Sequence, residues 1–160
     1  MPAQDPFQPA DDDARTLARS LIETSDHAAL AVIQPGTTLP SATRVALAVA
    51  PDGAPMTLIS ELASHTAALR ANPACALLIG DTAGKGDPLT HPRLTLHGSA
   101  AFIARSDPAC AGIRAHFLDQ RPKSTLYADF PDFSFVRFEI TDGLLNAGFG
   151  KAYRLTAADL

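Results

Sequence analysis

A chain of 160 residues, with 46% hydrophobic and 19% charged residues, has the length and composition of one globular domain that buries its own core. Its formal net charge of −4 argues against a broad nucleic-acid-binding surface and against binding to acidic membranes. The N-terminus lacks the basic end and apolar run of a signal peptide, and no segment has the length of a membrane span. We therefore expect a single cytoplasmic domain, residues 1–160, in which residues 1–10 form a loose arm.

Three segments of the sequence have the apolar spacing of helices. We expect these helices over residues 11–25, over residues 62–71 and from residue 106 onward. The second ends at Asn72-Pro73, because the residue before a proline is disfavoured in the helical conformation. In the third helix Ile113 and Phe117 are expected to face the core, whereas Arg121 is expected to face water.

Apolar runs typical of strands lie between and after these helices. They cover residues 28–34, 42–50, 56–60, 75–79, 93–104, 135–140 and 144–149. Asp52-Gly53 indicates a hairpin between the second and third runs, and residues 141–143 indicate another between the last two. Gly98 permits a bend in the longest run. The pattern predicts a mainly β (α+β) fold: a closed antiparallel barrel of six or seven strands with peripheral helices.

Polar side chains gather where the third run meets the second helix. Ser60, Ser64, His65 and Thr66 lie at a helix start, where free backbone N–H groups favour an anion such as phosphate. The alternative is that Ser60 or Ser64 simply caps the helix. Arg44 lies at the end of its predicted hairpin nearest Ser60, so its guanidinium is expected to reach the same anion.

The remaining histidines lack the spacing of metal ligands. The sequence contains no H-E-x-x-H motif, so we expect these side chains to lie on the surface or to form hydrogen bonds in the core. These histidines are His27, His91, His97 and His116. We expect no metal site of several side chains, and we assign no catalytic residue.

Four blocks, in this order along the chain, carry a resemblance to a known family. They cover residues 43–46, 60–73, 91–98 and 148–153. Together they resemble the FMN-binding split β-barrel family related to pyridoxamine 5′-phosphate oxidase, nearest its haem-utilisation (HugZ-like) branch. The resemblance implies an FMN-dependent oxidoreductase with a small-molecule substrate, built as a homodimer that holds two flavins between its subunits. The alternatives are a non-catalytic flavin- or haem-binding protein and a haem-degrading oxygenase. Ligation of haem iron would require only one neutral imidazole, and that role stays open among His27, His91, His97 and His116.

The resemblance also implies roles for individual residues, carried over by position. The FMN phosphate would be held by Arg44, Ser60, Ser64, His65 and Thr66, the backbone around Val45, Ala46 and Leu62 would lie near the flavin, and Arg93 would approach the isoalloxazine ring. The vitamin B6 oxidases usually have adjacent arginine and lysine where this chain has His65-Thr66. The implied anion pocket is therefore weaker, and it strengthens at low pH if His65 is protonated.

Overall fold

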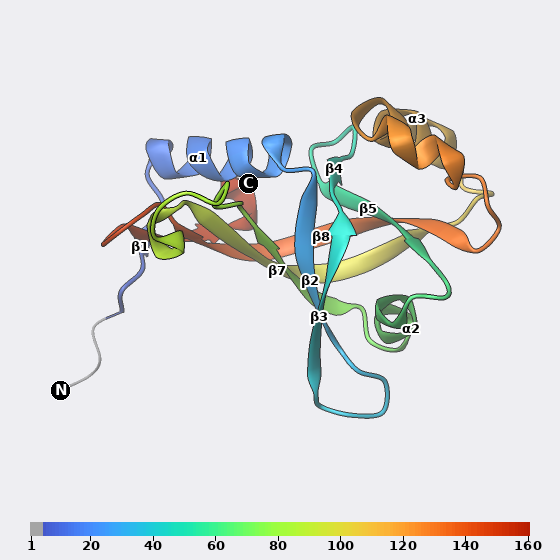
Figure 1. The fold of residues 1–160 in the computed structure, drawn as a ribbon, viewed down its shortest axis with the longest axis horizontal. Helices are drawn as coiled ribbons and strands as arrows, with labels where there is room; N and C mark the ends of the chain where they lie inside the picture. The colour runs from blue at the N-terminus through green and yellow to red at the C-terminus, as the bar shows by residue number, and fades with distance from the viewer. Residues whose placement is uncertain (1–4) are drawn as a thin grey trace.

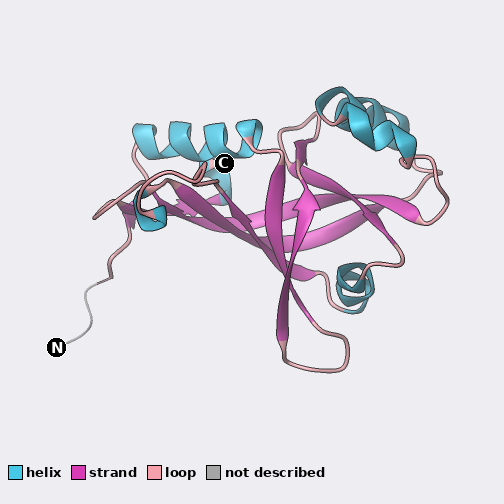
Figure 2. Ribbon diagram, viewed as in Figure 1, coloured by secondary structure: helices cyan, strands magenta, loops and turns pink. Residues whose placement is uncertain are grey.

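The computed structural model describes residues 5–160, most of which lie in one twisted sheet and the helices around it (Figures 1 and 2). The strands are β1 (Gln8–Pro9), β2 (His27–Ile33), β3 (Pro40–Ala46), β4 (Ala48–Val49), β5 (Pro55–Ser60), β6 (Ala74–Ile79), β7 (Arg93–Ile103), β8 (Phe133–Asn146) and β9 (Ala152–Thr156). The α-helices are α1 (Asp12–Thr24), α2 (Ser64–Ala71) and α3 (Cys110–Gln120), and the 3-10 helices are η1 (Pro88–Thr90), η2 (Pro122–Leu126) and η3 (Ala157–Asp159). These bounds confirm the three predicted helices.

The strands form a nine-stranded mixed sheet that does not close into a complete barrel over the residues described. Its main path runs β1-β9-β8-β7-β6-β2-β3, and β5 pairs with β8 while carrying β4 on its other edge. β1 and β9 are parallel, whereas the other pairs are antiparallel. The mainly β class is therefore confirmed, but the expectation of a closed antiparallel barrel of six or seven strands is wrong.

One cause of the difference is a break in the predicted strand 42–50. The backbone N–H of Leu47 donates to the carbonyl of Asp26, and the chain changes partner at this point. β3 pairs along its whole length with β2, and only Ala48 and Val49 pair with β5. The predicted hairpin is therefore reduced to its tip, and Arg44 does not lie in a ladder with the strand that ends at Ser60.

A second difference concerns the end of the chain. The predicted turn at 141–143 is wrong, because β8 continues through it as one 14-residue strand. Gly143 is needed for close packing instead: a Cβ there would lie 3.2 Å from Leu96 Cδ2 and 3.3 Å from the Thr95 carbonyl oxygen. The true hairpin follows at residues 147–151 and leads into β9.

The predicted bend at Gly98 is confirmed. The β7–β8 ladder changes register between His97 and Gly98, so that Thr141 on β8 has no partner in it. A Cβ added at Gly98 would lie 2.1 Å from the Glu139 carbonyl oxygen. Only a glycine allows the two backbones to approach so closely at this bulge.

Two groups of apolar side chains pack the helices against the sheet, and the alternation along β5 and β8 places these groups on opposite faces. Ala14, Ala18 and Ile22 of α1, with Leu69 of α2, join the larger core, which includes buried residues of β2, β6, β7 and β8. Ile113 and Phe117 of α3 join a second core against β4 and β5, as their spacing predicted. Within residues 5–160 no helix is both long enough and apolar enough to cross a bilayer.

Arg121 does not face water as expected. Its Nε donates to the Leu47 carbonyl over 2.6 Å and its Nη2 to the Ser25 carbonyl over 2.8 Å. The guanidinium therefore connects the end of α3 to the segments before β2 and before β4. An arginine can do this because it has several N–H donors, and helical spacing alone does not reveal such a role.

The segment expected to be a loose arm is partly ordered. Residues 1–4 lie outside the described residues, but Gln8 and Pro9 pair with Tyr153 and Arg154 of β9. Nearby, Arg15 Nε donates to Asp159 Oδ1 over 2.7 Å. The two ends of the described chain are therefore held together.

Asp159→Asn is expected to lower the melting temperature near pH 7 and to have only a small effect near pH 2. The hydrogen bond from Arg15, followed by those from Thr156, lowers the pKa of Asp159 from 3.8 to about 2. A depressed pKa contributes stability above the unfolded value, and that contribution is lost as pH falls from about 4 to about 2. Thermal unfolding across this range measures it. Asp119→Asn, at an exposed position of α3, is the matched control, and an equal effect of both variants at pH 7 would contradict the prediction.

Candidate functional site

At the start of α2, most polar side chains form hydrogen bonds with other groups of the same chain. Ser60 Oγ donates to Asp132 Oδ2 over 2.9 Å and accepts from the Leu62 N–H over 3.1 Å. The buried Thr66 donates through Oγ1 to the Ser60 carbonyl over 2.6 Å. These bonds fasten β5 to α2, and they bring a carboxylate to the position where the sequence suggested a phosphate. The Leu62 side chain is 90% exposed.

His65 and Ser64 lie on the next turn of the same joint. His65 Nδ1 is 3.0 Å from Thr43 Oγ1, which connects α2 to β3. Burial lowers the pKa of His65 from 6.5, so the imidazole is neutral at pH 7 and adds no positive charge. Ser64 is exposed and borders a hollow of about 300 Å³ that is also lined by Ser41 and Gln34.

Arg44 is separated from this joint by the alternation of its strand. Thr43 points toward His65, so the next residue, Arg44, points to the opposite face of β3. Its side chain is exposed, and within residues 5–160 it makes no ion pair with a carboxylate. Val45 is buried in the core, and the Ala46 carbonyl accepts from Thr57 Oγ1 over 2.6 Å. The structure thus brings Ser60, His65 and Thr66 together, and it places Arg44 on the other side of the strand.

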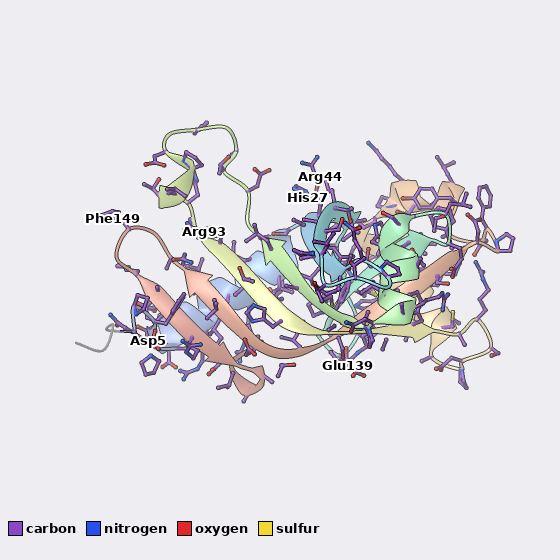
Figure 3. The ribbon with its side chains drawn as sticks, turned by 90° about the horizontal axis from the view of Figure 1, so that it is seen from below. Asp5, His27, Arg44, Arg93, Glu139 and Phe149 are labelled. Atoms are coloured by element: carbon purple, nitrogen blue, oxygen red, sulfur yellow. The ribbon has the colours of Figure 1, made fainter. Side chains whose placement is uncertain are left out.

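Arg93 begins β7 at the far side of the sheet. Its Nη1 donates to the Leu89 carbonyl over 3.1 Å, so the guanidinium supports the loop that contains η1. In Figure 3 Arg44 lies beside His27, while Arg93 lies between them and the turn at Phe149. The predicted site residues therefore occupy two regions, the α2 joint and the outside of the sheet.

The outside of the sheet forms a continuous surface across five strands. Residues opposite one another in an antiparallel ladder share a face, so the ladder partners of Arg44 can be followed from β3 to β8. We call this surface the outer face. It comprises Arg44, Ala29, Leu78, Thr95 and Leu144 in one row, and Ala42, Ala31, Ala76, His97 and Asp142 in the next.

The outer face is less polar than the solvent side of an antiparallel sheet usually is. Alanines occupy four of its ten positions, and Leu78 is 46% exposed in the middle of the first row. Next to them, apolar side chains that include Ile33 and Pro40 line a hollow of about 220 Å³. Small apolar side chains on an open sheet leave room for another surface or for a flat ligand to approach the backbone closely.

One hydrogen-bonded pair stands on this apolar background. His97 Nδ1 lies 2.7 Å from Asp142 Oδ1, and the two side chains are 44% and 45% exposed. The sequence alone left His97 as one of four candidate haem ligands, without a choice among them, and it placed Asp142 in a turn. The alternation of Arg93, Thr95 and His97 does indicate an outward imidazole, but its partner follows only from the β7–β8 register.

Comparison with known proteins agrees with this fold. A family model described as CREG, beta-barrel, matches residues 9–159. A chloroplastic heme oxygenase, HOZ, of Arabidopsis thaliana is 42% identical over 100 residues, which are 62% of this chain. The structure of a heme binding protein from Mycobacterium smegmatis superposes with a TM-score of 0.83 and 25% identity over 96% of this chain.

A protein of the pyridoxinephosphate oxidase family from Clostridium acetobutylicum has the same fold, with a TM-score of 0.71 and 16% identity, over 94% of this chain and 99% of its own. The chain spans only 29% of the length of the Arabidopsis protein and 60% of the mycobacterial chain. The resemblance to split-barrel proteins related to pyridoxamine 5′-phosphate oxidase is confirmed, and this chain belongs to the CREG β-barrel family.

Proposed function

We propose that this chain binds haem on the outer face, at an interface between two copies of itself. The observation that carries the proposal is the row of alanines on an open sheet, next to a histidine with a free ring nitrogen. A porphyrin is flat and apolar over most of its area, and it needs close approach to a surface without large side chains.

A second copy of the chain is the natural cover for this face. Alone, the outer face exposes Leu78 and the alanines around it to water, and a bound haem would remain open on its other side. A two-fold interface uses the same patch on both partners, so it encloses a ligand with little additional surface. The homodimer that the resemblance implied is therefore part of the proposal.

Arg44 gives the face the charge that an anionic cofactor requires. It is exposed in the same row as Leu78, and His27 lies diagonally across from it on β2. A guanidinium without a carboxylate partner favours a propionate or a phosphate by charge-assisted hydrogen bonds. Two relatives with haem in their names, at 42% and 25% identity, favour the propionates of haem.

FMN is the second candidate, and Arg44 is the observation that favours it. The same guanidinium suits a flavin phosphate, in the role that the family resemblance implied. The α2 joint offers less support, because Asp132 accepts from Ser60 there and His65 is neutral. An FMN-dependent oxidoreductase would use the cofactor for the redox chemistry and the protein for its position. The substrate would be a small molecule.

Titration of the purified protein with haem is expected to give a saturable, red-shifted Soret band. FMN added at the same concentration is expected to keep the absorption and fluorescence of the free flavin. Saturable quenching of FMN fluorescence, without any Soret shift in the haem titration, would identify FMN rather than haem as the cofactor. Loss of the Soret band after addition of ascorbate in air, with product bands at longer wavelength, would identify a haem-degrading enzyme.

A further inference from the structure

We infer that His97 supplies the axial nitrogen to haem iron and that Asp142 positions it. The inference rests on the proposed function, since it names the iron ligand within the proposed haem site. Asp142 acts through the imidazole and does not contact the metal.

The backbone holds the pair rigidly. His97 and Asp142 are direct partners in the β7–β8 ladder, immediately before the register shift at Gly98. Beside Asp142, Gly143 is buried against Leu96, where even a methyl group would press on the Leu96 side chain and the Thr95 carbonyl oxygen. Close packing on one side and a bulge on the other set which residue of β8 faces His97.

The hydrogen bond determines the form of the imidazole. A carboxylate of Asp142 can only accept, so the proton of neutral His97 lies on Nδ1 and is donated to Oδ1 over 2.7 Å. Nε2 then carries the free lone pair, which is the form that binds a metal. A carboxylate behind a ligating histidine fixes the ring and makes its nitrogen more basic.

Two other histidines are engaged elsewhere. His65 contacts Thr43 at the α2 joint, on the other side of β3. His91 Nε2 lies 2.5 Å from the Lys85 carbonyl oxygen, in an exposed loop. His27 also belongs to the outer side of the sheet, and its Nδ1 lies 2.5 Å from Asp26 Oδ1. It is the one rival with a similar arrangement, so it enters the test.

The pair does not hold a metal ion by itself. Among residues 5–160 there is no group of three or more histidine, cysteine, aspartate or glutamate side chains with metal-binding geometry. A metal at His97 therefore needs ligands from another source. Haem iron brings four from its porphyrin and leaves axial positions for a protein nitrogen. A single outward imidazole on an apolar face suits this requirement.

Absorption and electron paramagnetic resonance spectra compare the haem complex of the parent with those of three variants, His97→Ala, His27→Ala and His116→Ala. The structure predicts that only His97→Ala loses the histidine-ligated spectrum, that its haem affinity falls about tenfold or more, and that added imidazole restores the spectrum. His116 is exposed on α3 and serves as the matched control. An unchanged spectrum in His97→Ala, or its loss in His27→Ala, would overturn the inference and leave haem binding in place.

Asp142→Asn separates positioning from structure. We expect this variant to bind haem and to lower the frequency of the iron–histidine stretching band of the ferrous complex, because an amide makes the imidazole a weaker donor. A band at the parent frequency would remove Asp142 from the proposal. If the parent itself shows no saturable haem binding, the proposed function fails. Failure of the inference about His97 and Asp142 is different, because the parent would then still bind haem.

Discussion

Gly98→Ala is expected to destabilise the fold by about 3 kcal/mol or more, since the new methyl group has no space. Its Cβ would lie 2.1 Å from the Glu139 carbonyl oxygen and 2.9 Å from the Glu139 carbonyl carbon. Both atoms belong to the backbone of β8, so neither can rotate away as a side chain would. The central β7–β8 ladder must separate or change register to accept the substitution.

Gly112→Ala is the matched control for this prediction. Gly112 lies within α3, and a Cβ there would meet nothing within 4 Å. Replacing a helical glycine by alanine stabilises by up to about 1 kcal/mol through the lower entropy of the unfolded chain. Urea unfolding, with m-values equal to that of the parent, should show a lower free energy of unfolding for Gly98→Ala and a higher one for Gly112→Ala. If Gly98→Ala lowered the free energy of unfolding by less than about 1 kcal/mol, the backbone at the bulge would have made room for the methyl group, and the prediction would be wrong.

Leu78→Arg is expected to convert the proposed homodimer to a monomer and to weaken haem binding by more than about tenfold. Leu78 lies in the same row of the outer face as Arg44. Two copies related by a two-fold axis would therefore bring several like charges together in an apolar contact. The fold should persist, because Leu78 is already 46% exposed in the isolated chain.

Light scattering after size-exclusion chromatography measures this effect, with Leu126→Arg as the control. Leu126 is 82% exposed on η2, away from the outer face, so the same change of residue there should leave mass and haem affinity unaltered. A dimeric Leu78→Arg variant that binds haem as tightly as the parent would place both the interface and the cofactor elsewhere. A monomeric parent would refute the homodimer.

Local patterns of the sequence predicted most elements, because apolar spacing and turn residues act over a few positions. α1, α2 and the bend at Gly98 belong to this group. Which strands pair with one another did not follow from these local patterns. Whether residues 42–50 stay with one neighbour depends on a backbone hydrogen bond from Leu47 to Asp26, 21 positions earlier, and no local signal records it. The glycine at 143 resembles a turn residue although it serves packing.

The same distinction applies to the candidate site. The residue types at the α2 start predicted a polar cluster, and the structure joins Thr66 to Ser60 and His65 to Thr43 there by hydrogen bonds. Alternation along β3 separated Arg44 from its neighbours, but which face of the strand meets α2 is a tertiary property. The pair of His97 and Asp142 joins positions 45 residues apart, so it required the register of two long strands.

The position of β8 in the sheet has a consequence for biosynthesis. This strand pairs with β5, β7 and β9, yet it is completed only at Asn146, after both β5 and β7 have been synthesised. A nascent chain shorter than that presents β5 and β7 with open backbone edges, which attract strands of other molecules. Ribosomes that stall before Asn146 therefore release aggregation-prone fragments, and efficient production of the protein depends on rapid synthesis of β8 or on chaperones that cover these edges.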